Sequence, residues 1–295
     1  MVDSTLAIAT ARAPKRGVGR ILVRRPLFWA AALVLTILVA IAAFPSVFAN
    51  LFGNGDPFAC DLANSRQPPT DGHPFGFDLQ GCDVWATAIY GARSSLLVGV
   101  IAVLIASTIA IAVGILAGLA GGVVDWFVSR VIEIFLGFPF LLAAIVVLNT
   151  LGERTVWTVS LVLGVFGWPL MARLMRTSVR GIRNTDYTVA ARTMGLGWVR
   201  IVRSYILPNA VQPVIVLATI TTGGVIVAES TLTYLGIGLQ APAFSWGLQI
   251  GAAARVFQSA PHTLILPAIL LALTVTSIVA LGEELRTAFD PKEGR

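Results

Sequence analysis

Long apolar runs, each close to 20 residues and almost free of charge, dominate this 295-residue sequence. A helix of about 20 apolar residues is long enough to cross the roughly 30 Å hydrocarbon layer of a membrane. Six such runs are present, at residues 27–49, 96–119, 132–151, 157–171, 211–237 and 263–281. The sequence therefore predicts an all-α polytopic membrane protein with six transmembrane helices, the fourth of which is the shortest.

The composition supports a membrane protein. Hydrophobic residues make up 56% of the chain, and charged residues make up 12%, about half of their usual share in soluble proteins. These values exclude a soluble enzyme, a disordered chain and a disulfide scaffold. The two cysteines and two histidines form no CxxC pair and lack the spacing of a four-ligand zinc site. We therefore expect neither a metal site nor a cofactor in this chain.

Lysine and arginine are distributed unevenly between the segments that join the runs. If the chain crosses six times, 17 of the 21 lie on one side, six of them before residue 27 and seven between 173 and 209. The other side holds Arg66, Arg93, Arg154 and Arg255. Cytoplasmic loops carry the excess of these residues, so both termini are predicted to be cytoplasmic. The same distribution accounts for the net charge of +6 without a nucleic acid partner.

The first run has two alternative interpretations. It could be a signal peptide, and Arg24-Arg25 could belong to a twin-arginine signal. The run exceeds the 7 to 15 residues usual for the apolar part of a signal peptide, so a retained membrane anchor is favoured. The basic residues before it are expected to orient the chain and to contact lipid headgroups.

The segment 50–93 is the longest polar stretch on the predicted extracytoplasmic side. Five aspartates and several turn signals, such as Pro68-Pro69 and Asp71-Gly72, predict a loop. Cys60 and Cys82 both lie in this segment, in an oxidising compartment. A disulfide between them is favoured over two free thiols.

The polar stretch between the fourth and fifth runs is too hydrophilic to lie in lipid. It reads TDYTVAARTMGLGWVRIVRSYILPNAVQP over residues 185–213. We expect a short helix at 187–194, a turn in which Gly195 and Gly197 adopt the left-handed conformation, and a second helix at 198–207. Pro208 would then begin the next membrane helix. A helical hairpin held between two spans is suited to docking.

This stretch resembles the EAA loop of ATP-binding-cassette (ABC) importer permeases, written EAA-x3-G-x9-I-x-L-P. Two positions depart from the pattern: Val189 stands in place of Glu, and Tyr205 in place of Ile. The loss of Glu weakens the expectation of a specific polar contact with an ATPase, whereas the backbone shape of the loop should be retained. The resemblance implies that the loop docks an ATPase. The residues to which this role is carried over are Tyr187, Ala190, Ala191, Gly195, Leu207 and Pro208.

Motifs elsewhere narrow the resemblance to the C-type permease subunits of oligopeptide, dipeptide and nickel importers. Phe77-Asp78 and Gly81-Cys82-Asp83 depart from the usual Thr-Asp and Gly-Arg-Asp. The motifs similar to that subunit are His73-Pro74-Phe75-Gly76, Gly91-Ala92-Arg93-Ser94-Ser95-Leu96, Gly137-Phe138-Pro139, Trp168-Pro169, Leu235-Gly236-Ile237-Gly238 and Ser245-Trp246-Gly247. Their order and spacing are more specific than any single motif.

The resemblance implies a type I ABC importer permease fold in a bacterial plasma (inner) membrane. It also implies three partners: a second homologous permease, two ATP-binding subunits or one fused ATPase, and an extracytoplasmic substrate-binding protein. The expected cargo is peptides, with nickel chelates, glutathione or other small solutes as alternatives. We do not expect an enzyme, and ATP and Mg²⁺ should be bound by the partner subunits. The only lysines, Lys15 and Lys292, each follow a proline and form no Walker A loop.

These expectations give a linear organisation of the chain. A basic tail (1–26) precedes the first membrane helix (27–49), and the extracytoplasmic segment follows (50–93). The five-helix permease core (94–285) contains the docking loop at about 185–209, and a second cytoplasmic tail (286–295) ends the chain.

A few residues within the predicted spans are distinctive. Gly114, Gly118 and Gly122 line one helix face and would allow close helix packing, within the chain or with another permease. Glu229 is the only ionisable residue deep in a span; it would line the pathway or a subunit interface, or else be a hydrogen-bonded structural acid. Glu133 is expected to be a solvated or capping charge. His73 and His262 are expected to be structural.

Other classes of membrane protein fit less well. A secondary transporter usually carries several intramembrane charges or related broken helices. A channel needs a filter or a charged ring, which a homo-oligomer could still form. An intramembrane serine protease needs a histidine base within the bilayer. Charging or deleting the loop 190–195 separates these classes, because only the importer would lose ATPase association.

Overall fold

The computed structural model describes residue 19 and residues 22–289. The predicted tails at 1–26 and 286–295 lie largely outside the described residues, as do Lys15 and Lys292.

Within the described residues, five helices are long and apolar enough to cross a membrane, and one further apolar pair is bent by 84°. The five are α2 (Pro26–Ala43), α4 (Val84–Ala120), α7 (Val156–Arg183), α11 (Gln212–Tyr234) and α13 (His262–Phe289). The bent pair is α5 (Gly122–Gly137) and α6 (Phe140–Leu151). The shorter elements are α3 (Pro45–Ala49), η1 (Leu62–Asn64), α8 (Asp186–Thr193), α9 (Trp198–Ile201), η2 (Val202–Ile206), α10 (Leu207–Ala210) and α12 (Trp246–Arg255). The architecture is the all-α polytopic fold that the apolar runs predict.

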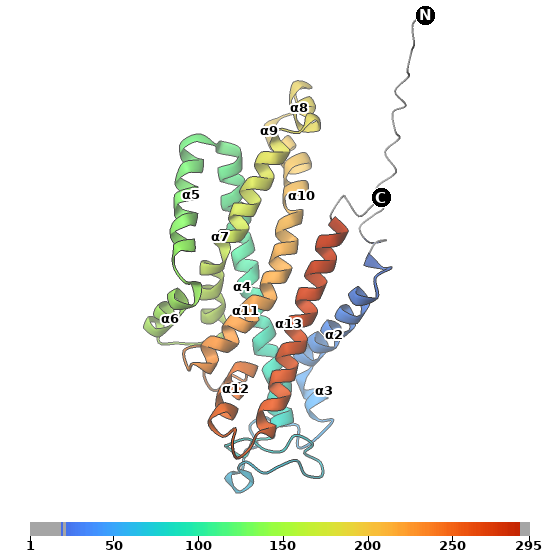
Figure 1. The fold of residues 1–295 in the computed structure, drawn as a ribbon, viewed down its shortest axis with the longest axis vertical. Coiled ribbons are helices and arrows are strands. Elements are labelled where there is room, and N and C mark those ends of the chain that lie inside the picture. Colours follow the sequence, from blue (N-terminus) through green and yellow to red (C-terminus); the bar gives the residue numbers. More distant parts are fainter. Residues whose placement is uncertain (1–18, 20–21, 290–295) are drawn as a thin grey trace, which may run out of the picture.

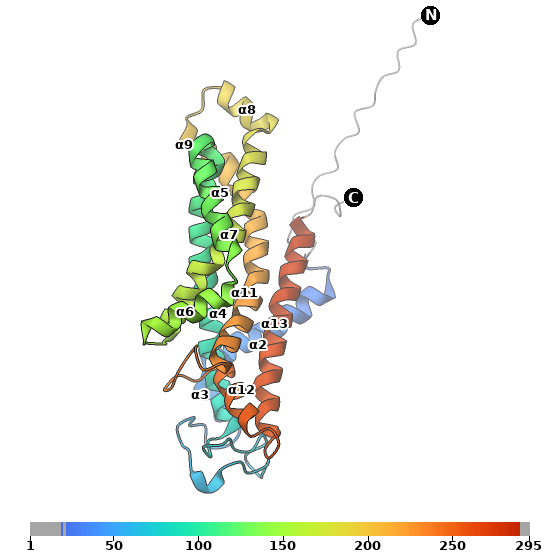
Figure 2. The same cartoon turned by 60° about the vertical axis from the view of Figure 1, so that its left-hand side comes forward.

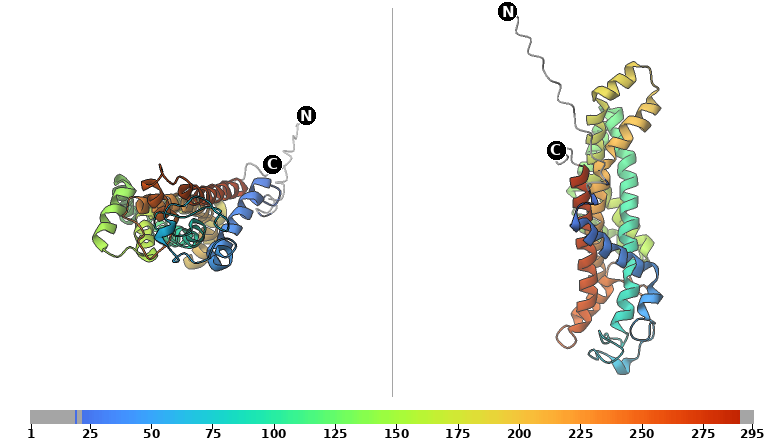
Figure 3. Two further views of the ribbon diagram at one scale, coloured as in Figure 1. Left: turned by 90° about the horizontal axis from the view of Figure 1, so that it is seen from below. Right: turned by 90° about the vertical axis from the view of Figure 1, so that its right-hand side faces the viewer.

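The long helices run along the longest axis of the molecule (Figure 1). α8 and α9 lie at one end of this axis, and the loop that precedes α4 lies at the other end (Figure 2). α5 and α6 form one edge of the molecule and α2 the opposite edge (Figure 3). The two segments expected on opposite sides of the membrane are therefore at opposite ends of the fold.

The first predicted span, 27–49, is not one continuous helix. α2 ends at Ala43, and α3 begins at Pro45. Between them Phe44 has φ −124° and ψ 56°, outside the helical region. The ring of a proline disfavours the helical conformation in the preceding residue, which accounts for the break.

The third predicted span, 132–151, is divided in the same way. Phe138 is extended, and Pro139 is the N-cap of α6. α5 contains the beginning of this run and α6 the end, so the run forms a bent helix pair and not one continuous helix. The long apolar stretch hides the break because neither Phe138 nor Pro139 lowers its hydropathy enough to interrupt the pattern.

Two boundaries are shifted by helix caps. Oδ1 of Asp83 accepts a hydrogen bond of 2.8 Å from the backbone N–H of Trp85 and begins α4, so the loop expected over 50–93 ends at Asp83. α7 begins after its N-cap Thr155 and continues to Arg183, well beyond the predicted end at 171. α4, with 37 residues, is about 55 Å long and extends past the hydrocarbon layer.

α4 and α7 pack closely because two glycines remove the side chains between them. A Cβ atom on Gly114 would lie 2.6 Å from Cβ of Met175, and one on Gly118 would lie 2.7 Å from Cβ of Val179. The glycine face therefore packs within this chain. Gly122 does not belong to it: it has φ +52°, opens α5 after the end of α4, and has no atom within 4 Å of an added Cβ.

Candidate functional site

The polar stretch after α7 forms a helical hairpin at the tip of the molecule, consisting of α8, a turn and α9 (residues 185–201; Figure 1). Oγ1 of Thr185 donates a hydrogen bond of 2.8 Å to the carbonyl oxygen of Ile182 and also hydrogen-bonds to Oγ1 of Thr188 (3.0 Å). These bonds connect the last turn of α7 to the first turn of α8. The hairpin is thus a direct continuation of a membrane helix.

One glycine, and not two, forms the turn of the hairpin. Gly195 has φ +76°, and the N–H of Leu196 donates to the carbonyl oxygen of Ala191 (3.2 Å), as at a helix end closed by a left-handed residue. Gly197 has φ −60° and is the N-cap of α9. The expectation that Gly197 is also left-handed is therefore wrong.

Trp198 holds the two sides of the hairpin together. The guanidinium carbon of Arg183, at the end of α7, lies 6.0 Å from its ring centroid, and that of Arg192, at the end of α8, lies 5.9 Å away. Arg183 also donates from Nη1 to the carbonyl oxygen of Leu119, at the end of α4 (2.7 Å). Trp198 thus connects the hairpin to two long helices. Sequence reasoning missed these contacts, although a tryptophan in an arginine-rich segment was a visible signal.

A partly buried ion cluster supports the base of the hairpin. Arg176 donates from Nη2 to Oδ2 of Asp125 at 2.9 Å and from Nε to Oδ1, and Arg180 donates from Nη2 to Oδ2. Asp125 lies in the first turn of α5, and both arginines lie on α7. The cluster fixes α5 to the helix that carries the hairpin. The sequence analysis did not single out Asp125.

The exposed surface of α8 is mixed, with apolar side chains beside the exposed Asp186, Arg192 and Thr193. Tyr187, Val189 and Ala190 are exposed, as is Met194 at the end of the helix, whereas Ala191 is buried inside the hairpin. Of the expected small pair, only Ala190 is available to a partner. Val189, in place of the acidic residue, removes one charge from this surface, while Asp186 and Arg192 remain exposed on it.

The helix expected over 198–207 is present and continues to residue 210, but it is not α-helical throughout. It passes through the π-helical turn η2, in which the N–H of Leu207 donates to the carbonyl oxygen of Val202, five residues earlier. Pro208 has no N–H for the carbonyl of Ser204, and its ring crowds that carbonyl, which accounts for the wider turn. Pro208 lies in the first turn of the short α10, which begins at Leu207, and the membrane helix α11 begins only at Gln212.

Glu229 lies inside the bundle. It is fully buried and accepts hydrogen bonds from Oγ of Ser230 (3.2 Å) and Oγ1 of Thr233 (2.9 Å). The neighbouring α12 is fixed to α4, because the backbone N–H of Trp246 donates to Oγ of Ser95 (3.2 Å). Glu229 is therefore enclosed by its own chain and is not exposed on the surface of this structure. This burial favours the structural alternative, and the role of Glu229 in a pathway or at a subunit interface stays a prediction.

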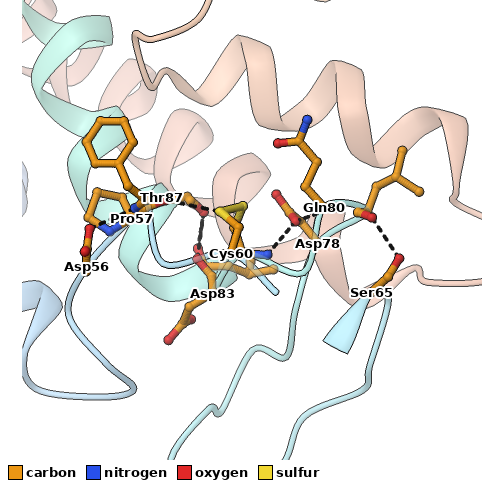
Figure 4. Close-up of a disulfide and its surroundings, with 12 residues drawn as sticks. Asp56, Pro57, Cys60, Ser65, Asp78, Gln80, Asp83 and Thr87 are labelled. Carbon is orange, nitrogen blue, oxygen red and sulfur yellow. Dashed lines mark hydrogen bonds between the residues drawn. A yellow bond between two sulfur atoms is a disulfide. The ribbon is translucent and has the colours of Figure 1, made fainter. Parts of the chain in front are cut away.

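The loop before α4 is closed by a disulfide between Cys60 and Cys82 (Figure 4). Oδ1 of Asp78 accepts hydrogen bonds from the N–H groups of Gln80 (2.8 Å) and Cys82 (2.9 Å), beside the bridge. Burial raises the pKa of Asp78 above its ordinary value, against the effect of these N–H donors. The bridge therefore rests on a tightly hydrogen-bonded turn.

The two histidines and Glu133 have local partners. Nδ1 of His73 lies 2.9 Å from Oδ2 of Asp83, the residue that caps α4, and Nε2 of His262 lies 3.4 Å from the carbonyl oxygen of Phe77. Glu133 pairs with Arg130 on the exposed side of α5. Both histidines therefore contact the loop before α4 or its cap, whereas Glu133 belongs to an exposed ion pair.

Comparisons with known proteins agree on one family. Residues 110–295 match the family model described as "Binding-protein-dependent transport system inner membrane component". The chain is 39% identical to the dipeptide transport system permease protein DppC of Bacillus subtilis (strain 168) over 232 residues, 78% of this chain and 72% of that protein. It is 31% identical to the oligopeptide transport system permease protein OppC of the same organism over 261 residues, 88% and 85% of the two chains.

Solved structures share the fold. A chain of the MetNI methionine ABC transporter in an inward-facing conformation aligns with a TM-score of 0.57 at 20% identity, covering 69% of this chain and 97% of that one. A chain of an amino acid ABC transporter, solved with histidines, aligns with a TM-score of 0.50 at 17% identity, covering 70% and 94%.

Proposed function

This chain belongs to the family of binding-protein-dependent transport system inner membrane components, and from that premise we propose that it is the C-type permease subunit of an ATP-driven peptide importer. In this role it forms half of a translocation pathway together with a second, homologous permease. The curated relatives named for dipeptide and oligopeptide transport support peptides as the cargo. A relative in Shigella flexneri serotype 5b is named for glutathione, itself a small peptide, and is 35% identical over 274 residues.

The observation that carries the proposal is the attachment of the hairpin to the membrane helices. The hairpin continues α7, is connected to α4 through Arg183, and is supported by the Asp125 cluster on α5. A force applied to α8 therefore acts on three helices together. Rigid-body movement of such a unit is the type of motion by which a membrane pathway opens alternately to its two sides.

The exposed surface of α8 is the proposed contact with an ATPase subunit on the cytoplasmic side. Tyr187, Val189, Ala190 and Met194 present side chains of the type that pack into a groove of a partner. The partners would be two ATPase subunits or one fused ATPase, which bind ATP and Mg²⁺, and an extracytoplasmic binding protein that delivers the peptide. This chain would contribute no catalytic residue.

Purification and uptake together test the proposal. The tagged chain is purified in mild detergent, the co-purifying proteins are identified, and ATP-dependent uptake of labelled peptides is measured in reconstituted vesicles. We expect a nucleotide-binding subunit in the purified material and uptake that requires ATP. Absence of any such subunit, or uptake independent of ATP, would contradict the proposal.

A matched pair of variants locates the contact. Ala190→Asp places a charge on the exposed face of α8, whereas Leu62→Asp places the same charge on an exposed residue at the opposite end of the molecule. We expect the first variant to lose the ATPase subunit and the second to retain it. A channel or secondary transporter would conduct its solute equally well with either change.

A further inference from the structure

An open cavity of about 820 Å³ lies between three segments of the chain. One wall is α4 from Arg93 to Ile101. The second is the loop 152–155 with the first residues of α7, and the third is the loop 240–243 between α11 and α12. These segments meet in the half of the molecule opposite to the hairpin, near α6 and α12 (Figure 1). The volume is within the range of about 300–1,000 Å³ that is typical of small-ligand sites.

The lining of the cavity combines apolar surface with a few charges. Leu97, Ile101 and Trp157 provide apolar side chains, while Arg93, Arg154 and Glu153 provide two positive charges and one negative charge. Only four of the 21 Lys and Arg residues are expected on the extracytoplasmic side, and two of those four line this cavity. Lys and Arg are depleted on that side. Two arginines at one cavity therefore concentrate positive charge there.

The two arginines differ in how they are held. Arg154 donates from Nη1 to the carbonyl oxygen of Gly236 (2.6 Å) and from Nη2 to Oδ1 of Asn149 (3.2 Å), so its guanidinium is fixed at the end of α11. The Arg93 side chain is exposed, and no hydrogen bond or ion pair joins it to the rest of the described chain. Arg93 thus offers an unused fork of N–H donors beside a fixed positive charge.

We propose that this cavity binds the free C-terminal carboxylate of a peptide, with Arg93 as the direct partner and Arg154 as the supporting positive charge. The planar guanidinium matches the geometry of a carboxylate and can donate two parallel hydrogen bonds to it. Glu153 provides the opposite charge for the peptide ammonium group, and the apolar walls accept its side chains. This inference rests on the proposed function, because it identifies where the cargo of that function is held within the permease.

The test measures binding directly, apart from transport. The assembled importer, purified without its binding protein, is equilibrated with radiolabelled alanyl-phenylalanine or with its C-terminal amide, which lacks the carboxylate. We expect the wild-type importer to bind the free acid about tenfold more tightly than the amide, an effect typical of one charge-assisted hydrogen bond. Arg93→Gln should reduce this ratio to about one to two, while Arg93→Lys should retain part of it.

The control variant is Arg255→Gln, which removes an exposed extracytoplasmic arginine at the end of α12 that does not line the cavity. It should retain the wild-type ratio. Equal binding of acid and amide by the wild-type importer, or an unchanged ratio in Arg93→Gln, would overturn the inference. In parallel, we measure ATP-dependent peptide uptake by the wild-type importer with its binding protein. Uptake without the acid preference would contradict only this inference, whereas absence of uptake would contradict the proposed function.

Discussion

Arg183 and Trp198, on either side of α8, face each other with the guanidinium carbon 6.0 Å from the centroid of the indole ring. Arg192 lies at nearly the same distance from that ring, 5.9 Å. The helix α8 is therefore held between a long membrane helix and α9 by one aromatic side chain. A partner that binds α8 would act on a hairpin of fixed shape.

Replacing Trp198 should loosen this hairpin. Two cation–π contacts at partly exposed sites contribute roughly 1–2 kcal/mol together. In Trp198→Ala we expect tryptic cleavage within the hairpin of the purified importer to accelerate by about 5- to 30-fold, the factor that corresponds to this free energy. Cleavage at Arg192 and Arg200, followed by mass spectrometry, is the measurement.

Trp126 provides the matched control. It also lies against an arginine, Arg130, at 5.9 Å, but on α5 and away from the hairpin. Trp126→Ala should leave cleavage within the hairpin at the wild-type rate. Equal acceleration in both variants would mean that the effect arises from general loosening of the protein.

The two glycines of the hairpin should respond differently to alanine. Gly195 has φ +76°, where an L-residue costs about 1–2 kcal/mol, whereas Gly197 has φ −60°, which alanine adopts freely. We expect Gly195→Ala to recover several-fold less ATPase subunit on purification, and Gly197→Ala to recover a wild-type amount. A Cβ atom added to either glycine would have no other atom within 4 Å, so the two variants differ in backbone strain and not in steric crowding. Equal recovery from the two variants would show that the left-handed turn is not required for docking.

Much of this fold was predictable because the membrane imposes strong rules on sequence. The apolar runs identified the spans, and the spacing of Ala190, Gly195 and Pro208 identified the family, which the comparisons confirm. The breaks at Pro45 and Pro139 were missed because a single proline scarcely changes the hydropathy of a long window. Proline was nevertheless the visible signal in both cases.

The contacts of the site were less predictable than its position. Asp125 meets Arg176 and Arg180 across more than 50 residues of sequence, and a single sequence carries no information on such pairing. Burial of Glu229 was equally hidden, because it depends on the packing of α11 against α4 and α12. Local patterns predicted helices and turns, whereas tertiary packing decided which charges became paired.

Packing between α4 and α7 should not tolerate a methyl group at Gly114. An added Cβ would lie 2.6 Å from Cβ of Met175 and 2.9 Å from the carbonyl oxygen of Ala172. Such overpacking typically costs about 1–3 kcal/mol. We expect Gly114→Ala to lower the thermal unfolding midpoint of the purified protein in detergent by several degrees.

Gly181, on α7, is the control for this substitution. It has no atom within 4 Å of an added Cβ, and alanine favours a helix by about 1 kcal/mol relative to glycine. Gly181→Ala should leave the midpoint unchanged or raise it. A lower midpoint in Gly181→Ala, or an unchanged one in Gly114→Ala, would contradict the close packing of the two helices.

Substitution of Glu229 distinguishes a structural acid from a residue of the pathway. Glu229→Gln keeps an oxygen acceptor for the hydroxyl groups of Ser230 and Thr233, whose rotation can also accommodate the new amide. Glu229→Ala leaves both hydroxyls without this partner and opens a cavity beside α12, at a cost of about 1–3 kcal/mol for the lost hydrogen bonding alone. We therefore expect the glutamine variant to retain peptide uptake within about twofold of wild type at an unchanged unfolding midpoint, and the alanine variant to unfold several degrees lower. If the glutamine variant instead unfolded at the wild-type temperature but no longer took up peptide, the negative charge itself would be required for transport, and Glu229 would have to reach the pathway in another conformation of the importer.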